Sequence, residues 1–236
     1  MNIALIIAGG SGTRMGQDIP KQFLTVNEKP VIVYTLEAFE HHPQIDEIAV
    51  VCIEGWEQML RAYAKQFNIS KLNKIFPGGE SGQESIKNGV FGLMEDHNAD
   101  DIVMIHDAIR PMVSEEIISD CLVKTKMYGN AITVMPCAEA MLETKDFKSS
   151  ESTYPRDELK RTQTPQGFKL GEIYDLHREA VKKGITNSIA SCTLMVEMGR
   201  KVFFSSGSEK NIKLTTVEDI DIFKALLAAK RSEWLK

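Results

Sequence analysis

The residues best suited to chemistry lie in a glycine-rich segment near the N-terminus, AGGSGTRMGQDIPKQF (residues 8–23). The apolar run before it is typical of a buried strand, and ligands of open α/β sheets bind beyond the carboxyl ends of the strands. Glycines let backbone N–H groups approach an anion closely, and Arg14 and Lys21 add two positive charges. The segment therefore indicates a phosphate-binding loop, and a glycine-rich turn with solvated charges is the alternative interpretation.

This loop matches neither of two common nucleotide-binding motifs. The string G-x-x-x-x-G-K-[ST] occurs nowhere in the chain. Gly10 and Gly12 begin a G-x-G-x-x-G pattern, but Met15 stands where the third glycine belongs. An ATPase-type P-loop and a standard dinucleotide loop are therefore excluded.

A second group of candidates follows another apolar run, in IHDAIRP (residues 105–111). Asp107 shares the predicted sheet edge of the glycine loop, and Mg²⁺ bound to a polyphosphate needs only one or two protein carboxylates. The alternative for Asp107 is a helix cap, and for Arg110 it is a surface ion pair. His106 can act as a base, but a hydrogen-bonded structural role is favoured.

Two further segments carry candidate ligand contacts. PGGESGQESIKNG (residues 77–89) is a second glycine turn before a helix, and its N–H groups and Ser85 can line a nucleoside pocket. Lys213 precedes the last predicted helix and can reach a phosphate. Each has a simpler alternative: an ordinary strand–helix connection for the turn, and a solvated side chain for the lysine.

The elements that must position these residues follow from the hydrophobic pattern. Apolar β-branched runs alternate with helical periodicity, which favours a mostly parallel sheet covered on both faces. The predicted strands are residues 3–8, 47–53, 73–78, 101–107, 131–136 and 201–206. The predicted helices are residues 31–42, 56–67, 81–96, 114–128, 170–183, 188–198 and 216–231.

One segment interrupts this alternation. Residues 138–169 are polar and turn-rich, and they are too long for an ordinary connection. We therefore expect one α/β domain over residues 1–236, a Rossmann-like three-layer sandwich with a projecting β-arm at about 138–169.

Composition and charge exclude several classes of function. The chain has 236 residues, a net charge of −5 and a pI near 5.6, so no basic excess favours nucleic acid. No apolar run reaches the roughly 18 residues of a membrane span, and Met1 leads directly into a predicted strand without a signal segment. The four cysteines are far apart and form no C-x-x-C motif. We expect a cytoplasmic protein with buried, reduced thiols.

Taken together, these segments resemble the sugar-alcohol phosphate cytidylyltransferases. The similarity rests on AGGSGTRMG, IPKQF, GGESGQESI, HDAIRP, QTPQGF and NIKLTT, which run in the family's order from residue 8 to residue 216. The resemblance implies a fold of the nucleotide-diphospho-sugar transferase type. It also implies transfer of CMP from CTP to a phosphorylated sugar alcohol, with release of pyrophosphate, a requirement for Mg²⁺, and a homodimer in which the arm crosses to the second subunit.

The resemblance also implies a role for each candidate residue. Arg14, Lys21 and Lys213 would act on the CTP phosphates, and Asp107 would bind Mg²⁺. The nucleotide would contact Ala8, Gly9, Gly10, Ser11, Gly12, Thr13, Gly79, Glu80, Ser85 and Ala108. The acceptor would contact Arg110, Glu139, Ala140, Arg156 and Thr164. The chemistry is compatible with these roles, because two anions must be brought together and an acceptor phosphate needs neither a protein nucleophile nor a general base.

The chain departs from the family pattern mainly around the predicted acceptor. Glu139-Ala140 stand where the family has Asp-Thr, Gly82 stands near a frequent arginine, and Asn187-Ser188 replace an acidic position. CTP is therefore the expected nucleotide. Ribitol 5-phosphate or a similar polyol phosphate is the favoured acceptor, and 2-C-methyl-D-erythritol 4-phosphate is the alternative. A nucleotidyltransferase for another nucleotide or a sugar 1-phosphate, and a non-catalytic nucleotide-binding protein, are the remaining alternatives.

Overall fold

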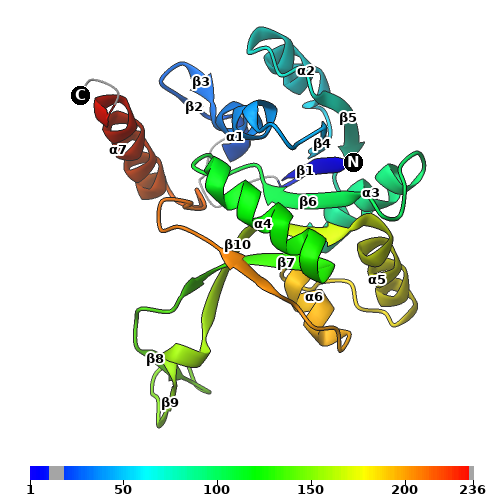
Figure 1. Ribbon diagram of the computed structural model, residues 1–236. Helices are drawn as coiled ribbons and strands as arrows, with labels where there is room; N and C mark the ends of the chain where they lie inside the picture. Colours follow the sequence, from blue (N-terminus) through cyan, green and yellow to red (C-terminus); the bar gives the residue numbers. More distant parts are fainter. Residues whose placement is uncertain (11–18, 234–236) are drawn as a thin grey trace.

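A seven-stranded sheet with the order β11-β7-β10-β6-β1-β4-β5 forms the framework of the protein (Figure 1). The structure is a computed structural model that describes residues 1–10 and 19–233, and the side chains up to residue 229. Six of the strands are parallel: β1 (Asn2–Ala8), β4 (Glu47–Cys52), β5 (Leu72–Pro77), β6 (Ile102–Asp107), β7 (Asn130–Pro136) and β11 (Phe204–Ser206). The seventh, β10 (Lys160–Lys169), runs antiparallel between β6 and β7.

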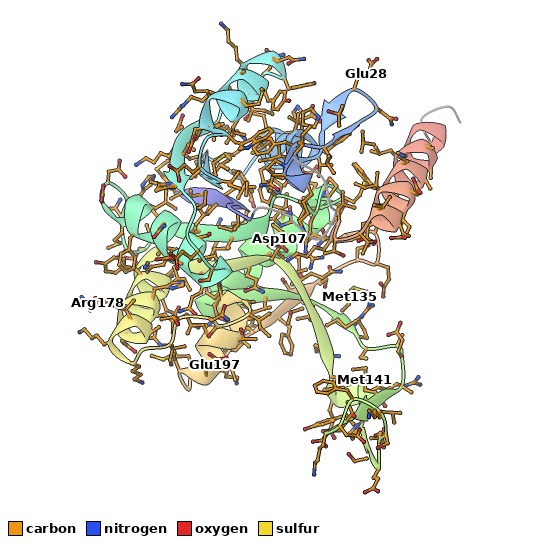
Figure 2. The ribbon with its side chains drawn as sticks, turned by 180° about the vertical axis from the view of Figure 1, so that it is seen from behind. Glu28, Asp107, Met135, Met141, Arg178 and Glu197 are labelled. Atoms are coloured by element: carbon orange, nitrogen blue, oxygen red, sulfur yellow. The ribbon has the colours of Figure 1, made fainter. Side chains whose placement is uncertain are left out.

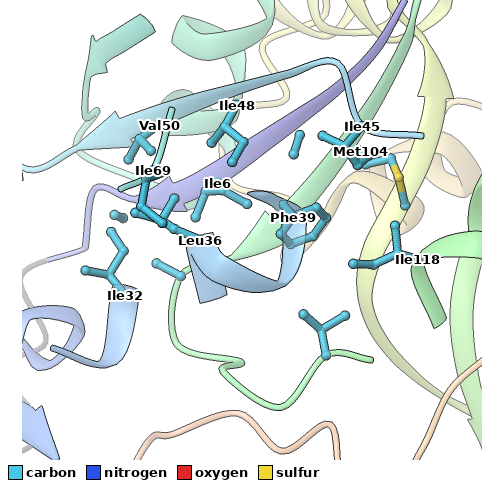
Figure 3. Packing of buried hydrophobic residues seen from close by; sticks show 14 of the residues in the cluster. Ile6, Ile32, Leu36, Phe39, Ile45, Ile48, Val50, Ile69, Met104 and Ile118 are labelled. Atoms are coloured by element: carbon cyan, nitrogen blue, oxygen red, sulfur yellow. The ribbon is translucent and has the colours of Figure 1, made fainter. Parts of the chain in front are cut away.

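Helices cover both faces of this sheet. One face carries α1 (Val31–His41), α2 (Glu57–Gln66) and α4 (Glu115–Tyr128). The other carries α3 (Gly82–Met94), α5 (Leu170–Lys182) and α6 (Ser191–Glu197). Ile6 of β1 packs against the first group of helices, as Figure 3 shows, while its neighbour Leu5 packs against the second. The predicted three-layer α/β sandwich is therefore confirmed.

Smaller elements lie beside the glycine loop. The short helix η2 (Lys21–Phe23) leads into a hairpin of β2 (Thr25–Val26) and β3 (Lys29–Pro30). The last helix, α7 (Val217–Glu233), packs on this hairpin and on the start of α1 through the buried side chain of Phe223. Across the described residues, we find no helix with the length and apolar character that a membrane crossing requires.

The predicted arm projects from the body of the protein (Figure 1). It consists of the antiparallel pair β8 (Met141–Glu143) and β9 (Ser152–Tyr154), followed by the short helix η3 (Arg156–Glu158). All residues of β8 and β9 are exposed. Because so little of this segment is buried within the chain, its position relies on its two connections to the sheet.

The largest difference from the sequence analysis lies at the end of the arm. No strand is predicted within residues 160–169, yet these residues form β10 in the middle of the sheet. Their polar side chains and Pro165 hide the strand pattern, because proline in a sheet is usually confined to edges or bulges. Pro165 lies where the register of β10 against β7 shifts, between Thr162 and Gln166, so the ladder accommodates it at an irregularity.

The other predicted elements are present, with small shifts in their ends. β11 begins at Phe204 rather than at residue 201, and α6 begins at Ser191 rather than at residue 188. The backbone N–H of Ser188 donates instead to the side chain of Gln83 (2.7 Å), which holds this residue against α3. The four cysteines are free and buried, as expected.

The packing of α3 on the sheet generates a test of the fold. A methyl group at Gly89 would lie 2.7 Å from Cγ2 of Val51 and 2.8 Å from Cδ1 of Leu5, both of which are fully buried. We expect Gly89→Ala to lower the free energy of unfolding by about 1–3 kcal/mol, because overpacking forces neighbours from their positions. Urea unfolding measures this loss.

Gly82→Ala, on the same helix, is the matched control. A methyl group there meets no atom within 4 Å, so we expect a change of only a few tenths of a kcal/mol, in the stabilising direction. Equal effects of the two substitutions would contradict the close approach of α3 to the sheet.

Candidate functional site

Four strand ends meet along one edge of the sheet and bring most of the predicted residues together. β1 ends at Ala8, β4 at Cys52, β5 at Pro77 and β6 at Asp107. Because these strands are parallel, their carboxyl ends lie at the same edge. Two clusters form there, a cavity beside β4 and β5 and a charged group beside β6 and β10.

The cavity has a volume of about 530 Å³ and lies between the glycine loop and the second glycine turn. Its lining residues are Gly9, Ile53, Glu54, Gly78, Gly79, Glu80, Glu84 and Asn88. Three of the seven predicted nucleotide contacts that the structure describes, Gly9, Gly79 and Glu80, therefore share one cavity. Its size suits the nucleoside part of a nucleotide, since small-molecule pockets usually measure about 300–1,000 Å³.

Ser85 holds the two glycine segments together. Its hydroxyl accepts a hydrogen bond from the backbone N–H of Gly79 (3.0 Å). A methyl group at Gly9 would lie 2.8 Å from the same oxygen and 3.2 Å from Cα of Gly78, so only glycine fits without displacement. Ser85 is 3% exposed, which means that it shapes the cavity wall from behind.

Carboxylates give this cavity a negative character. Glu54, Glu80 and Glu84 all line it. Glu84 also accepts a hydrogen bond from the backbone N–H of Glu80 (2.9 Å), and this bond, together with Lys87, holds the pKa of Glu84 below its usual value. A polyphosphate would be repelled here, whereas a neutral base or ribose with N–H and O–H donors would be accommodated.

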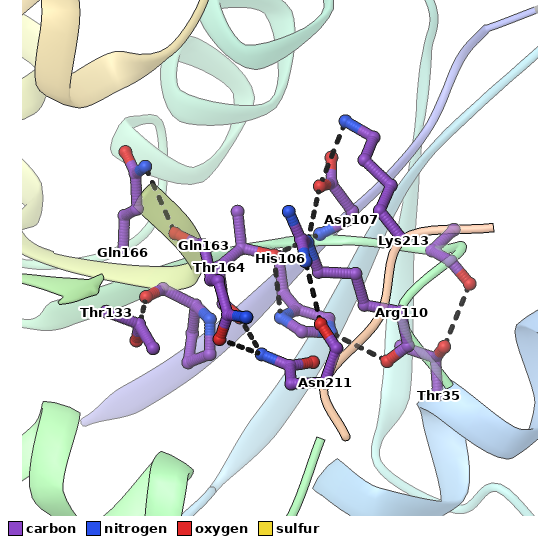
Figure 4. Close-up of polar contacts among 12 residues, drawn as sticks. Thr35, His106, Asp107, Arg110, Thr133, Gln163, Thr164, Gln166, Asn211 and Lys213 are labelled. Atoms are coloured by element: carbon purple, nitrogen blue, oxygen red, sulfur yellow. Dashed lines mark hydrogen bonds and ion pairs between the residues drawn. The ribbon is translucent and has the colours of Figure 1, made fainter. Parts of the chain in front are cut away.

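The charged group centres on Asp107 (Figure 4). Oδ2 of Asp107 contacts Nε of Arg110 and Nζ of Lys213, each at 3.1 Å. Burial alone would raise the pKa of Asp107, but the Lys213 ammonium and the Arg110 guanidinium outweigh it and hold the pKa below its usual value. The side chain of Lys213 is 43% exposed, so it remains accessible to a ligand while it neutralises the carboxylate.

Thr164 links the backbone of Asp107 to the ring of its neighbour His106. The Thr164 hydroxyl accepts a hydrogen bond from the backbone N–H of Asp107 (3.1 Å) and lies 3.0 Å from Nδ1 of His106. Burial lowers the pKa of His106 to about 4, so the ring is neutral at physiological pH. Its Nε2 faces the carbonyl of Arg110 (3.2 Å), which assigns the ring proton to Nε2 and makes Nδ1 the acceptor of the Thr164 hydroxyl.

Asn211 joins this group to the segment that carries Lys213. Nη1 of Arg110 donates to the carbonyl of Asn211 (2.8 Å), and the Asn211 amide donates to the carbonyl of Thr164 (2.9 Å). Asn211 is not among the residues predicted from the sequence, although it stands in the motif NIKLTT. A side chain that acts by bonding to groups distant in the sequence leaves no signal of its own there.

The remaining predicted nucleotide contacts differ in how they are placed. Ala8 ends β1, Gly10 follows Gly9, and Lys21 begins η2 beside this edge. Ala108 is fully buried, and its carbonyl accepts from the Thr35 hydroxyl (2.8 Å), so its backbone serves the fold. The predicted contacts that lie outside the described residues are Ser11, Gly12, Thr13 and Arg14.

Three predicted acceptor contacts lie on the arm rather than at the sheet edge. Glu139 and Ala140 are exposed between β7 and β8. Nη1 of Arg156 donates to the carbonyl of Ala138 (3.0 Å), which places these three residues near one another. In Figure 2 the arm, marked by Met141, lies well away from Asp107. Within one chain, the structure therefore does not bring them to the charged group.

The charged group also bears on the predicted metal. No set of three or more histidine, cysteine, aspartate or glutamate side chains among the described residues is arranged to hold a metal ion. Asp107 contacts its two cations through Oδ2, and its side chain is 23% exposed. Mg²⁺ commonly uses one or two carboxylates and takes its other ligands from phosphate and water. Asp107 therefore fits an ion that arrives with a polyphosphate.

The support of Asp107 by Thr164 generates a test of the site's structure. Thr164→Val keeps the shape but removes the hydroxyl, leaving the Asp107 N–H and His106 Nδ1 without this partner. We expect the free energy of unfolding to fall by about 1–3 kcal/mol, the usual cost of unpaired buried groups. Thr164→Ser retains the hydroxyl and should lose clearly less in the same denaturant experiment. Equal losses of unfolding free energy in the two variants would mean that the hydroxyl does not contribute to stability.

Known proteins match this chain over nearly its whole length. The family model described as IspD, 2-C-methyl-D-erythritol 4-phosphate cytidylyltransferase, matches residues 2–229. A ribitol-5-phosphate cytidylyltransferase of Lacticaseibacillus paracasei is 44% identical, over 98% of this chain and 99% of that protein. One of Vibrio parahaemolyticus is 42% identical, over 96% of each chain.

A solved structure shows the same fold. The 4-diphosphocytidyl-2C-methyl-D-erythritol synthase of Anaerococcus prevotii superposes with a TM-score of 0.82 at 25% identity, and the match covers 96% of each chain. The family model and the relatives match nearly the whole chain, and the solved structure shares its fold. The chain therefore belongs to the 2-C-methyl-D-erythritol 4-phosphate cytidylyltransferase family of CTP-dependent nucleotidyltransferases.

Proposed function

We propose that this enzyme transfers CMP from CTP to ribitol 5-phosphate, forming CDP-ribitol and pyrophosphate. The observation that carries the acceptor is the identity of 44% over nearly the whole chain to a relative named for ribitol 5-phosphate. The site geometry supports the reaction type, because a nucleoside-sized cavity adjoins a carboxylate flanked by two cations.

The two clusters divide the nucleotide between them. The acidic cavity takes the cytidine, and the glycine loop with Arg14 and Lys21 takes the triphosphate, toward Lys213 and Asp107. This arrangement is favoured because the carboxylates of the cavity repel phosphate, whereas Arg110 and Lys213 leave the region around Asp107 with a positive balance.

The reaction then depends on positioning and on charge. An oxygen of the acceptor phosphate attacks the α-phosphorus of CTP, and the bond from that phosphorus to the β-phosphate bridging oxygen breaks. The electron pair leaves with pyrophosphate, and no protein nucleophile takes part. Lys21, Lys213 and Arg14 lower the repulsion between the two anions and stabilise the charge that develops.

Asp107 would hold the metal in this proposal. Mg²⁺, when bound, neutralises charge on the triphosphate and polarises its phosphoryl oxygens. Arg110 and Lys213 keep the Asp107 carboxylate ionised, and Thr164 fixes its backbone. The carboxylate is therefore ready to bind a cation at neutral pH.

Thr164 has room for one contact with the acceptor. Its hydroxyl hydrogen is directed to His106 and one lone pair accepts from Asp107, so one lone pair remains. A phosphate dianion cannot donate to it, but a polyol hydroxyl can. We assign Thr164 to the hydroxyl chain of the acceptor and Arg110 to its phosphate.

The acceptor residues on the arm require a second copy of the chain. The arm exposes large apolar side chains: Met141, Leu142, Phe147 and Tyr154 are 41%, 68%, 93% and 54% exposed. Such a group on a projecting hairpin favours burial against a partner. We propose a homodimer in which Glu139, Ala140 and Arg156 of one subunit complete the acceptor site of the other.

A second acceptor has its own support. The matched family model is named for 2-C-methyl-D-erythritol 4-phosphate, so this branched acceptor remains the alternative. Ala140 distinguishes the two, because it removes a hydroxyl that the family pattern places against the acceptor. A ligand group that relies on a missing partner loses affinity.

An acceptor panel tests the proposed function. At saturating CTP and Mg²⁺, we expect kcat/KM for ribitol 5-phosphate to exceed that for 2-C-methyl-D-erythritol 4-phosphate by about tenfold or more. Pyrophosphate release measures the rate, and EDTA should abolish it. The reverse preference would establish the alternative acceptor. Ala140→Thr should shift the ratio toward the branched acceptor, and an unchanged ratio would remove Ala140 from the acceptor site.

Subunit mixing tests the shared site. Lys21→Ala and Arg156→Ala should each be nearly inactive, because a lost preorganised cation costs about a hundredfold or more in rate. After subunit exchange, their mixture should regain activity, since one site of each heterodimer then contains both residues. Mixing Lys21→Ala with the double variant Lys21→Ala/Arg156→Ala is the control and should regain none. Equal behaviour of the two mixtures would contradict the shared site.

A further inference from the structure

Gln22 is a buried polar residue in the short helix that carries Lys21. It lies between Lys21 and Phe23 in η2 and is only 2% exposed. The proposed function gives it no role, and its side chain does not line the cavity. A buried amide has to find hydrogen-bond partners, so the identity of those partners shows what it holds.

Both partners are backbone carbonyls at the start of the glycine loop. Nε2 of Gln22 donates to the carbonyl of Ala8 (2.8 Å) and to the carbonyl of Gly10 (3.0 Å). The two hydrogens of the Gln22 amide therefore bond two carbonyls, that of Ala8 at the end of β1 and that of Gly10 just beyond it. Gln22 thereby joins the start of the loop, at residues 8–10, to the segment that follows it.

The bond to Ala8 helps to set the direction of a backbone N–H, together with the bond that the backbone N–H of Ile53 donates to the same carbonyl (3.2 Å). In a trans peptide the C=O and N–H groups point in opposite directions. The carbonyl of Ala8 points toward Gln22, so the N–H of Gly9 in the same peptide points away from it. Gly9 lines the cavity and is packed on its other side against Gly78 and Ser85. Gly9 is therefore held from both sides.

The helix that carries Gln22 is itself fixed. Phe23 is 3% exposed, and its ring stacks on Trp56 with centroids 4.5 Å apart and planes at 17°. The backbone N–H of Phe23 donates to the carbonyl of Pro20 (2.8 Å). η2 is therefore anchored in the core on one side and bonded to the loop start on the other, and Lys21 shares that frame.

We propose that Gln22 is a positioning residue that sets the start of the glycine loop and Lys21 in a fixed relation for nucleotide binding. The inference rests on the proposed function for its ligand, CTP, but not for the structural clamp. Its removal should loosen the nucleotide site and leave the acceptor contacts, which lie elsewhere, unchanged.

The main test compares CTP binding in Gln22→Met with the natural protein. Methionine has a similar length and shape but donates no hydrogen bond. By calorimetry in Mg²⁺ without acceptor, we expect the Kd for CTP to rise about tenfold or more, a size typical of lost buried hydrogen bonds. The Gly10 carbonyl then loses its bond to Gln22, while the Ala8 carbonyl keeps its bond to the backbone N–H of Ile53. The KM for ribitol 5-phosphate at saturating CTP should change less than twofold. If Gln22→Met does not fold, Gln22→Asn is the second variant. It keeps the amide, but its side chain is one methylene shorter and cannot reach both carbonyls.

Asn130→Leu is the matched control. Asn130 is also a buried amide, 3% exposed, whose side chain bonds two backbone groups, the carbonyl of Lys201 and the N–H of Phe203, each at 3.1 Å. It begins β7, at the opposite edge of the sheet from Asp107. We expect this variant to lose thermal stability while its Kd for CTP stays within twofold of the natural protein. If Gln22→Met also leaves the Kd unchanged, Gln22 has only a structural role and the inference is wrong.

Amide hydrogen exchange separates this inference from the proposed function. In the absence of nucleotide, peptides that report on residues 8–10 and 19–23 should exchange at least about tenfold faster in Gln22→Met than in the natural protein or Asn130→Leu. If the natural protein binds no CTP, the proposed function fails, and the exchange rates still decide whether Gln22 holds the loop. Unchanged exchange in these peptides would overturn the clamp in either case.

Discussion

A partly buried carboxylate that must stay charged is the constraint around which the site is organised. Asp107 loses solvation at the end of β6, and the Lys213 and Arg110 cations on Oδ2 contribute most to holding its pKa below the ordinary value. Arg110 comes from the next turn of chain, whereas Lys213 comes from the segment before α7. Charge balance at Asp107 therefore relies on residues from distant parts of the chain. The hydrogen bonds of Asn211 and Thr164 hold these segments together.

The sheet explains why the two halves of the site are separate. β1 lies between β4 and β6, so its end at Ala8 has the cavity on one side and the charged group on the other. Carboxylates line the first, and cations flank the second. A nucleotide is complementary to this arrangement, because its neutral base suits the acidic cavity and its phosphates suit the cations. In the proposed reaction, this geometry would orient the substrate by electrostatics before any chemical step.

β10 gives the arm a direct connection to the chemistry. This strand returns from the arm and enters the sheet beside β6, where Thr164 meets the backbone of Asp107 and the ring of His106. A displacement of the arm would therefore act on the residue that supports the carboxylate. In the proposed dimer, the same strand would link the acceptor residues given to the partner with the metal position of its own subunit.

Apart from β10 and the short elements, the sequence by itself determined the order of strands and helices along the chain, because hydrophobic periodicity is a local property. The sequence also indicated the candidate residues near the strand ends. Gly9, Ser85, Asp107 and Lys213 stand in short motifs whose residue types alone suggest their chemistry. Only the tertiary structure decided that β10 is a central strand, because its polar residues and Pro165 are tolerated through pairing with β6 and β7. It alone decided the partners of Gln22, His106 and Asn211, whose roles consist of hydrogen bonds to groups that the fold brings near.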